Sequence, residues 1–331
     1  MYVIKQIELT KNYKLRYNKT GDYMKTCAVI YNPNSGHIFK KKYLKEYKQI
    51  LLKNDYNPKF IGTEYSGHAK EIVNHLEKVD LVISMGGDGT FNEVMSGNLE
   101  RNNPLILAHI PVGTTNDVGV MFGYGKDIKR NLKLLLDGVV KEMDICVING
   151  RPFVYVAGFG KFMQIPYNTP RKLKKKYGYM AYLIEGIKDF FSPTKLYNIT
   201  YHVNGITRTG LYSFMLISNA NRIAGINNFY RDVKLDDDQF EVLFCNFRHR
   251  SDIIRTFTKL MTTDVSKVSG IEFYKTNKID IKFEDYPKKA WCIDGEKLDR
   301  AVLNYEIHNI CNVKIMMPRK NIDKIFVNKK V

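Results

Sequence analysis

The chain has 331 residues, enough for two domains that each enclose a hydrophobic core. It is 44% hydrophobic and 26% charged, as expected of a soluble globular protein, and no apolar run approaches the roughly 20 residues of a membrane-spanning helix. The formal net charge of +18 predicts attraction to polyanions such as nucleic acid, an anionic membrane or phosphorylated substrates. The cysteines are dispersed without a C-x-x-C pair, which argues against a disulfide framework or a zinc site and predicts reduced thiols in the cytosol: Cys27, Cys146, Cys245, Cys292 and Cys311.

Residues 1–23 are polar and basic, and we leave this extension of unknown role out of the predicted fold. From residue 24 onward, apolar strands alternate with helices that have one apolar face. Strands are expected at 27–31, 59–63, from 81 and at 104–110, and helices at 39–51, 69–76, after 90, after 117 and at 128–136. This alternation predicts an α/β domain over residues 24–141, with a doubly wound parallel sheet covered by helices on both faces.

Loops follow the predicted strands at residues 32–36, 62–67, 86–90 and 111–117. In a parallel sheet of this kind, ligands bind beyond the carboxyl ends of the strands. We therefore expect all of these loops to lie along the same edge of the sheet.

The pattern changes after residue 141. Asn149-Gly150 and Asn204-Gly205 each separate two apolar runs, which predicts hairpins with type I′ turns. Further strands are expected at 240–247, 279–283, 290–293 and 302–307, and helical insertions near 171–189 and 251–261. We predict a mainly antiparallel β-sandwich domain over residues 142–311, after which the segment 312–331 returns to the first domain.

The stretch from Leu81 to Val94 predicts a strand, a glycine turn and a helix, because an apolar run is followed by GGDGT and then FNEV. The unpaired amides at such a helix start attract an anion such as phosphate. Asp88 in the turn fits phosphate if a Mg²⁺ ion, bound through water, lies between them. Three glycines alone are equally typical of a tight turn between core elements, but the acid and the polar Thr90 and Asn92 favour a nucleotide site.

Phosphoryl transfer needs a metal held by carboxylates and a base for the accepting hydroxyl. Asp88, Asp117 and Asp144 lie at or near predicted strand ends, and Glu296 follows an apolar strand. Taken singly, three of these acids have other interpretations. Asp117 suits a helix N-cap, Asp144 an acid at the start of a strand, and Glu296 a solvated turn.

Four motifs together resemble the diacylglycerol kinase catalytic family, most closely its bacterial soluble branch: NPNSG at 32–36, GGDGT at 86–90 with Asn92-Glu93 behind it, GTTND at 113–117 and IDGE at 293–296. The resemblance extends from about residue 24 to residue 318. GGDGT alone is shared with NAD kinases, whereas all four motifs in this order and spacing are specific.

This resemblance implies an ATP-dependent lipid kinase that converts diacylglycerol to phosphatidic acid, built from an α/β nucleotide domain and a β-sandwich. Asp88, Asp117 and Asp144 would hold the catalytic Mg²⁺ through water. Glu296 would be the general base that takes the proton of the lipid hydroxyl. The residues that would contact ATP are Asn32, Pro33, Asn34, Ser35, Gly36, Thr63, Gly86, Gly87, Asp88, Gly89, Thr90, Asn92, Glu93 and Thr114.

The resemblance also implies a structural Mg²⁺ loop over residues 234–240. Asp237 would supply a carboxylate, and Lys234 and Gln239 would supply backbone oxygens. This chain has Asp238 where the family usually has glycine, which puts the loop conformation in question. The alternative interpretation is an acidic, solvated turn.

A cluster of basic residues precedes several tyrosines in the second half: Arg171, Lys172, Lys174, Lys175 and Lys176. We expect this cluster to dock the protein on the inner face of the cell membrane, because each basic residue near anionic lipid contributes about 1 kcal/mol. The alternative is a solvated helix face. Nucleic acid would suit the charge, but no recognition motif accompanies it, and exposed strand edges make a homodimer plausible.

Other functions remain open on sequence alone. A close relative could phosphorylate another lipid alcohol, such as a sphingoid base or ceramide. An NAD kinase shares GGDG but is not expected to carry the Asp294-Gly295-Glu296 motif in a β-rich second half. A non-catalytic lipid- or nucleotide-binding regulator would be expected to have lost one of the acids that this chain retains.

Overall fold

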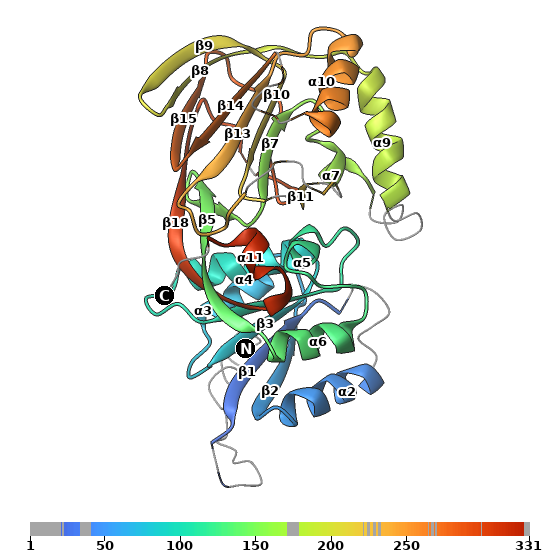
Figure 1. Cartoon of the computed structure of the whole chain (residues 1–331), viewed down its shortest axis with the longest axis vertical. Helices are drawn as coiled ribbons and strands as arrows, with labels where there is room; N and C mark the ends of the chain where they lie inside the picture. Colours follow the sequence, from blue (N-terminus) through green and yellow to red (C-terminus); the bar gives the residue numbers. More distant parts are fainter. Residues whose placement is uncertain are drawn as a thin grey trace. The chain divides into compact units, whose positions relative to one another are not determined.

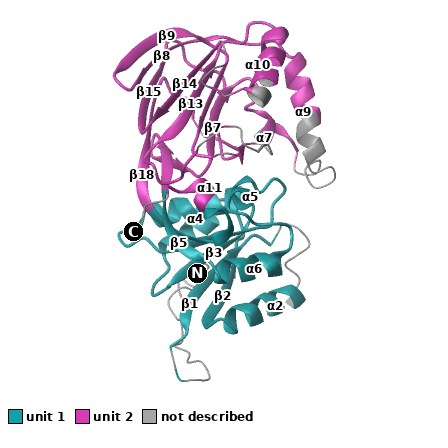
Figure 2. Cartoon of the chain, in the orientation of Figure 1, with its two compact units in different colours: residues 1–143, 313–322 teal, residues 144–312, 323–331 magenta. Residues whose placement is uncertain are grey.

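The computed structural model describes residues 21, 23–33, 41–170, 179–220, 222–223, 226–227, 230, 233–263, 265, 268, 270–298 and 300–327. The chain divides into two compact units (Figure 2): unit 1 contains residues 1–143 and 313–322, and unit 2 contains residues 144–312 and 323–331. Among the helices of these described ranges, none combines the length and apolar character needed to cross a bilayer.

Unit 1 is built on a parallel sheet in the order β2-β1-β3-β4, to which the last residues of β18 add beside β4. Most residues of β1, β3 and β4 are apolar and buried, as expected for strands covered on both faces. The strands are β1 (Lys25–Tyr31), β2 (Tyr56–Gly62), β3 (Leu81–Gly86), β4 (Leu107–Pro111) and β18 (Asn304–Met317).

The helices of unit 1 pack in pairs, with α2 against α6 and α3 against α4 (Figure 1). The start of α6 is fixed by Asp127, whose carboxylate accepts the N–H groups of Lys129 and Arg130. The predicted doubly wound parallel sheet is confirmed. The helices are α2 (Lys41–Leu52), α3 (His68–Asn74), α4 (Asp88–Leu99), α5 (Asp117–Met121) and α6 (Ile128–Leu136).

Unit 2 is a sandwich of two mainly antiparallel sheets, as predicted. One sheet has the order β18-β15-β8-β9, with β5 paired to β18 and β6 paired to β5, and the other has the order β14-β13-β10-β7-β16-β17. The strands are β5 (Val139–Ile148), β6 (Arg151–Phe153), β7 (Val156–Gly160), β8 (Tyr197–Val203), β9 (Ile206–Tyr212), β10 (Phe214–Ser218), β13 (Phe240–Cys245), β14 (Ile271–Thr276), β15 (Lys278–Phe283), β16 (Cys292–Ile293) and β17 (Glu296–Lys297), with a short separate ladder of β11 (Arg222–Ile223) and β12 (Ile226–Asn227).

Both predicted Asn-Gly hairpins are present in unit 2. Asn149 and Gly150 connect β5 to β6 with φ angles of 47° and 80°, and Asn204 and Gly205 connect β8 to β9 with 48° and 75°. Positive φ at both central positions is what a type I′ turn requires, and asparagine and glycine adopt it at low cost.

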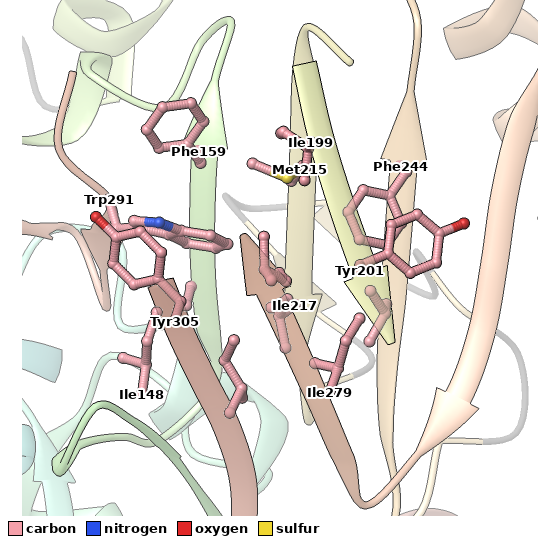
Figure 3. Packing of buried hydrophobic residues seen from close by; sticks show 14 of the residues in the cluster. Ile148, Phe159, Ile199, Tyr201, Met215, Ile217, Phe244, Ile279, Trp291 and Tyr305 are labelled. Atoms are coloured by element: carbon pink, nitrogen blue, oxygen red, sulfur yellow. The ribbon is translucent and has the colours of Figure 1, made fainter. Parts of the chain in front are cut away.

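The space between the two sheets of unit 2 is filled by apolar and aromatic side chains (Figure 3). Trp291 lies beside Tyr305 with ring centroids 5.4 Å apart, and Tyr201 stacks on Phe244 at 4.3 Å. Burial of such aromatic rings is the main stabilising contribution to a core of this kind.

A second apolar cluster lies on the outer face of the β13–β10 sheet, where Phe190 and Ile253 bring α9 (Tyr179–Phe191) and α10 (Arg250–Thr262) against it. The remaining short helices are α7 (Ile165–Asn168), η3 (Arg319–Asn321) and α11 (Ile322–Ile325). The strand expected at 302–307 continues through the apolar run at 313–317 as a single strand, β18. His308, Asn309 and Asn312 interrupt the apolar pattern and hide this continuity.

Candidate active site

The turn between β3 and α4 and the loop after β4 are packed so closely that a side chain does not fit at Gly86 or at Gly113. A Cβ on Gly86 would lie 2.5 Å from Thr90 Oγ1, and a Cβ on Gly113 would lie 2.7 Å from Gly87 Cα. The N–H of Val112 donates to the Gly86 carbonyl at 2.7 Å. The turn after β3 and the loop after β4 therefore meet backbone to backbone at the carboxyl edge of the sheet.

Asp88 joins these two segments through its side chain. It is the first residue of α4, is 8% exposed, and its carboxylate accepts the N–H of Asp117 at 3.0 Å and of Val118 at 3.3 Å. Asp117 is buried as the first residue of α5, and the N-cap is Asn116, with a φ of 52°. The interpretation of Asp117 as the N-cap is therefore wrong: the left-handed Asn116 holds that position, and its Oδ1 accepts the Gly113 N–H at 2.7 Å.

Glu93 connects α4 to the loop after β2. Its carboxylate accepts the N–H of Gly67 at 2.8 Å and of Ala69 at 3.1 Å, at the start of α3. Thr63, at the end of β2, donates its N–H to the Tyr31 carbonyl at 2.9 Å. A backbone hydrogen bond therefore joins the ends of β1 and β2, and the Glu93 side chain ties α4 to the start of α3.

In unit 2, Asp144 lies against the predicted structural Mg²⁺ loop. Its Oδ2 accepts the N–H of Asp238 at 2.7 Å, and its own N–H donates to the Leu235 carbonyl at 2.6 Å. Burial raises the pKa of Asp144, and the hydrogen bond from Asp238 opposes this rise. Burial also raises the pKa of Asp237, whose Oδ1 accepts the Gln239 N–H at 3.2 Å.

The geometry of Asp238 explains why the family usually has glycine at this position. Its φ is 56°, in the left-handed region that glycine adopts without strain and that aspartate tolerates better than most residues. The Asp238 side chain is held by two donors: the Cys311 thiol at 3.1 Å and Asn277 Nδ2 at 3.3 Å. The loop thus accommodates the aspartate.

Lys234 anchors the other end of this loop within unit 2. Its Nζ donates to the carbonyls of Asp323, Lys324 and Phe326 at 3.1, 3.2 and 3.1 Å, which caps the C-terminal end of α11. The ammonium group is therefore engaged with α11, and only the Lys234 carbonyl, which the resemblance implies as a ligand, could serve a metal.

Two acids in the β16–β17 hairpin of unit 2 have opposite surroundings. Asp294 is 5% exposed, and its carboxylate accepts the N–H groups of Val154, Tyr155 and Val156 at 2.7, 3.1 and 3.1 Å. The side chain of Glu296 is 50% exposed, and the guanidinium of Arg151 lies 3.6 Å from its Oε2. One acid fixes the turn, and the other is accessible to a reactant.

Comparison with known proteins identifies the family of this chain. The profile of the family described as "Diacylglycerol kinase catalytic domain" matches residues 26–148. A diacylglycerol kinase of Staphylococcus epidermidis is 32% identical over 300 residues, covering 89% of this chain and 93% of that protein. The chain belongs to the diacylglycerol kinase family.

One further relative and one solved structure are similar to this chain. The diacylglycerol kinase of Bacillus subtilis is 29% identical over 308 residues, 91% of this chain and 99% of that protein. A crystal structure described as a putative diacylglycerol kinase from Bacillus anthracis shares the fold, with a TM-score of 0.75 at 21% identity over 93% of this chain and 99% of that one. The family membership makes this protein a kinase.

The structure distributes the site residues expected for a diacylglycerol kinase over both units. In unit 1 the expected residues lie at the ends of parallel strands, in the loops that follow them or in the first turns of the next helices: Asn32, Pro33, Thr63, Gly86, Gly87, Asp88, Gly89, Thr90, Asn92, Glu93, Thr114 and Asp117. Unit 2 carries Asp144, Lys234, Asp237, Gln239 and Glu296. Asn34, Ser35 and Gly36, and the basic cluster Arg171, Lys172, Lys174, Lys175 and Lys176, lie outside the described residues.

The structure adds residues that the motifs did not single out. Asn116 closes the loop after β4, Asp294 clamps the β16–β17 turn, and Arg151 lies beside Glu296. Asp294-Gly295 has φ angles of 47° and 86°, so it is another hairpin turn of the Asp-Gly kind. The Asp-Gly dipeptide is the sequence pattern that predicts this turn. Nothing local indicates that the Asp294 carboxylate accepts backbone N–H groups some 140 residues earlier.

Proposed function

We propose that this kinase transfers the γ-phosphoryl group of ATP to the free hydroxyl of diacylglycerol and so produces phosphatidic acid. The observation that carries the proposal is the close-packed glycine turn at the start of α4, in a chain of this family. Gly87 precedes α4 and offers no side-chain cap, so the helix start presents backbone amides to a phosphate. ATP would bind at this edge of unit 1.

The residues of the predicted Mg²⁺ loop suit a hard cation. Asp237 supplies a carboxylate and the chain offers carbonyl oxygens at Lys234 and Gln239, the donor types that Mg²⁺ prefers. Burial, and after it the charge of neighbouring acids, raises the pKa of Asp144 and of Asp237, so negative charge on these carboxylates is unfavourable in the folded chain. A divalent cation bound to Asp237 would neutralise this charge and rigidify the loop.

Asp88 and Asp117 of unit 1 would hold a catalytic Mg²⁺, which supplies charge neutralisation at the phosphates when bound, and Asp144 of unit 2 is the third acid that the resemblance implies. Of these acids, Asp88 also holds the start of α5. We assign the general base to Glu296, because a base must reach the hydroxyl that it deprotonates, and this carboxylate is half exposed on a turn fixed by Asp294.

We also propose that α9 contributes to docking on an anionic membrane. Ile184, Ile187 and Phe191 are 47%, 52% and 59% exposed and recur at helical spacing, so they form one apolar stripe. The Arg250 guanidinium lies over the Phe191 ring at 5.1 Å and adds positive charge beside the stripe. Association of two copies of the chain stays a prediction.

Vesicle co-sedimentation tests the docking proposal. Replacing Ile184 and Ile187 together by serine should weaken binding to anionic vesicles at least tenfold, because the two half-exposed side chains together offer about the area of one isoleucine, whose burial is worth roughly 1.5–3 kcal/mol. Ile254→Ser is the control, because Ile254 is 58% exposed on α10. Equal binding of the double variant and the wild type would exclude docking through α9.

Transfer of labelled γ-phosphate from ATP to a panel of acceptors tests the reaction. The panel contains diacylglycerol in anionic mixed micelles, sphingosine, ceramide, phosphatidylglycerol and NAD. Glu296→Gln should lower transfer to diacylglycerol about a thousandfold and leave ATP binding intact, as loss of a general base does. Glu284→Gln, at an exposed position, is the control. Product on another acceptor but not on diacylglycerol would overturn the assigned substrate.

A further inference from the structure

Tyr65 forms an open aromatic surface just beyond the end of β2. It is 53% exposed, and one face of its ring is stacked on the imidazole of His68, with centroids 4.6 Å apart and planes within 8°. Its hydroxyl donates to Glu71 Oε2 at 2.6 Å. The ring is therefore fixed at its hydroxyl and on one face, while much of its surface is open to solvent.

The loop that carries Tyr65 is held in place from several directions. The Glu64 N–H donates to His68 Nδ1 at 3.0 Å, and His68 itself is buried at 2% exposure. The Glu93 carboxylate accepts the N–H groups of Gly67 and Ala69. The orientation of the Tyr65 ring is thus set before any ligand binds, which lowers the entropic cost of using it as a contact surface.

The position of this ring matches one requirement of a nucleotide that the glycine turn does not meet. The turn at 86–90 offers backbone groups for phosphates but no flat apolar surface for a base. Glu93 belongs to α4, the helix that starts at that turn, and its hydrogen bonds tie α4 to the Tyr65 loop. Both segments follow parallel strands of one sheet, so they share its carboxyl edge.

We propose that Tyr65 stacks on the adenine ring of ATP and, with His68 behind it, forms the base subsite of unit 1. This inference rests on the proposed ATP site and adds the contact that holds the purine. Stacking between a base and an aromatic side chain tolerates different bases, so the subsite would favour nucleotides over compounds without a base rather than select adenine strictly.

Direct binding measurements with two probes test this inference without a lipid acceptor. The probes are ATP and inorganic tripolyphosphate, which has the phosphates but no base, each titrated calorimetrically in the presence of Mg²⁺. Tyr65→Ala should raise the Kd for ATP about tenfold, equal to about 1.4 kcal/mol of stacking, and leave the Kd for tripolyphosphate unchanged. Tyr65→Phe should bind ATP nearly as the wild type does. Tyr23→Ala is the control, since Tyr23 is 47% exposed and precedes β1 at the opposite edge.

The outcomes separate this inference from the proposed function. If Tyr65→Ala binds ATP as tightly as the wild type, or loses tripolyphosphate equally, Tyr65 does not hold the base. If the wild type binds neither probe, both the proposed base subsite and the proposed ATP site are excluded. If ATP binding depends on Tyr65 but no phosphate reaches diacylglycerol, the subsite stands and only the assigned acceptor is wrong.

Discussion

The two units hold their acidic side chains in different surroundings. In unit 1, the carboxylates of Asp88 and Glu93 each accept two backbone N–H groups at the starts of helices. In unit 2, Asp144, Asp237 and Glu241 lie near other acids, and burial raises the pKa of each, that of Glu241 to about 7. Unit 1 stabilises its acids with its own backbone, whereas the acidic loop of unit 2 would gain from an added cation.

Asp294 is the exception in unit 2, and its removal should have the largest effect. Asp294→Ala would leave three backbone N–H groups of residues 154–156 without their acceptor. We expect the free energy of unfolding to fall by about 4 kcal/mol, because each buried donor left unpaired costs about 1–3 kcal/mol. Urea unfolding followed by tryptophan fluorescence measures this, since the only tryptophan, Trp291, lies in unit 2.

Asp285→Ala is the control for this variant, because Asp285 is exposed in the same part of the chain. Its stability should stay within about 0.5 kcal/mol of the wild type, as is usual for exposed sites. A similar loss in both variants would mean that the Asp294 clamp does not hold the hairpin.

The next largest effect should be a pH dependence that comes from unit 1. His109 is fully buried in β4 and stacks on Phe91, and burial lowers its pKa to about 3 from an ordinary value of 6.5. Between these values only the unfolded chain binds the proton. The contribution of His109 to stability is therefore complete above pH 6.5 and is lost progressively as the pH falls toward 3.

Unfolding at pH 7 and pH 4.5 checks this prediction. The free energy of unfolding should fall less in His109→Leu than in the wild type between these pH values. The difference should be about 3 kcal/mol, since each unit of pKa difference is worth 1.36 kcal/mol. The same replacement at His75, which is exposed in unit 1, is the control. An unchanged pH dependence in His109→Leu would contradict the assignment of acid sensitivity to this histidine.

The acidic loop of unit 2 should show the opposite dependence, in a smaller effect. Because the pKa values of Asp144 and Asp237 are raised, their burial becomes more costly as the pH rises and they ionise. Mg²⁺ in large excess over its Kd should therefore stabilise the wild type by about 2 kcal/mol at pH 7.5 and much less at pH 4.5. Thermal unfolding with and without Mg²⁺ measures this.

Asp237→Asn should abolish the stabilisation by Mg²⁺, whereas Asp285→Asn should retain it. A metal response that survives in Asp237→Asn would place the ion elsewhere. Equal stabilisation at both pH values would show that the cation does not compete with protons for these carboxylates.

The sequence predicted the architecture because the architecture depends on local patterns. Apolar periodicity identified the strands and helices of unit 1, and two Asn-Gly pairs identified the hairpins of unit 2. The contacts of the site depend instead on chain segments far apart. Neither the clamp of Asp294 on residues 154–156 nor the thiol of Cys311 beside Asp238 follows from a local pattern. Those contacts become visible only when the fold brings their segments together.

The smallest expected effect concerns Asp238 and tests the backbone conformation of the acidic loop. With a φ of 56°, Asp238→Gly relieves the left-handed strain but loses the hydrogen bonds from Cys311 and Asn277. These effects oppose each other, so stability should change by less than about 1 kcal/mol. Asp238→Ala keeps the strain and loses the same bonds, and it should be less stable than the glycine variant by about 1 kcal/mol. Urea unfolding of the two variants side by side gives this difference directly. If alanine and glycine prove equal, backbone conformation does not explain the glycine of the family, and the charge of Asp238 becomes the feature that distinguishes this loop.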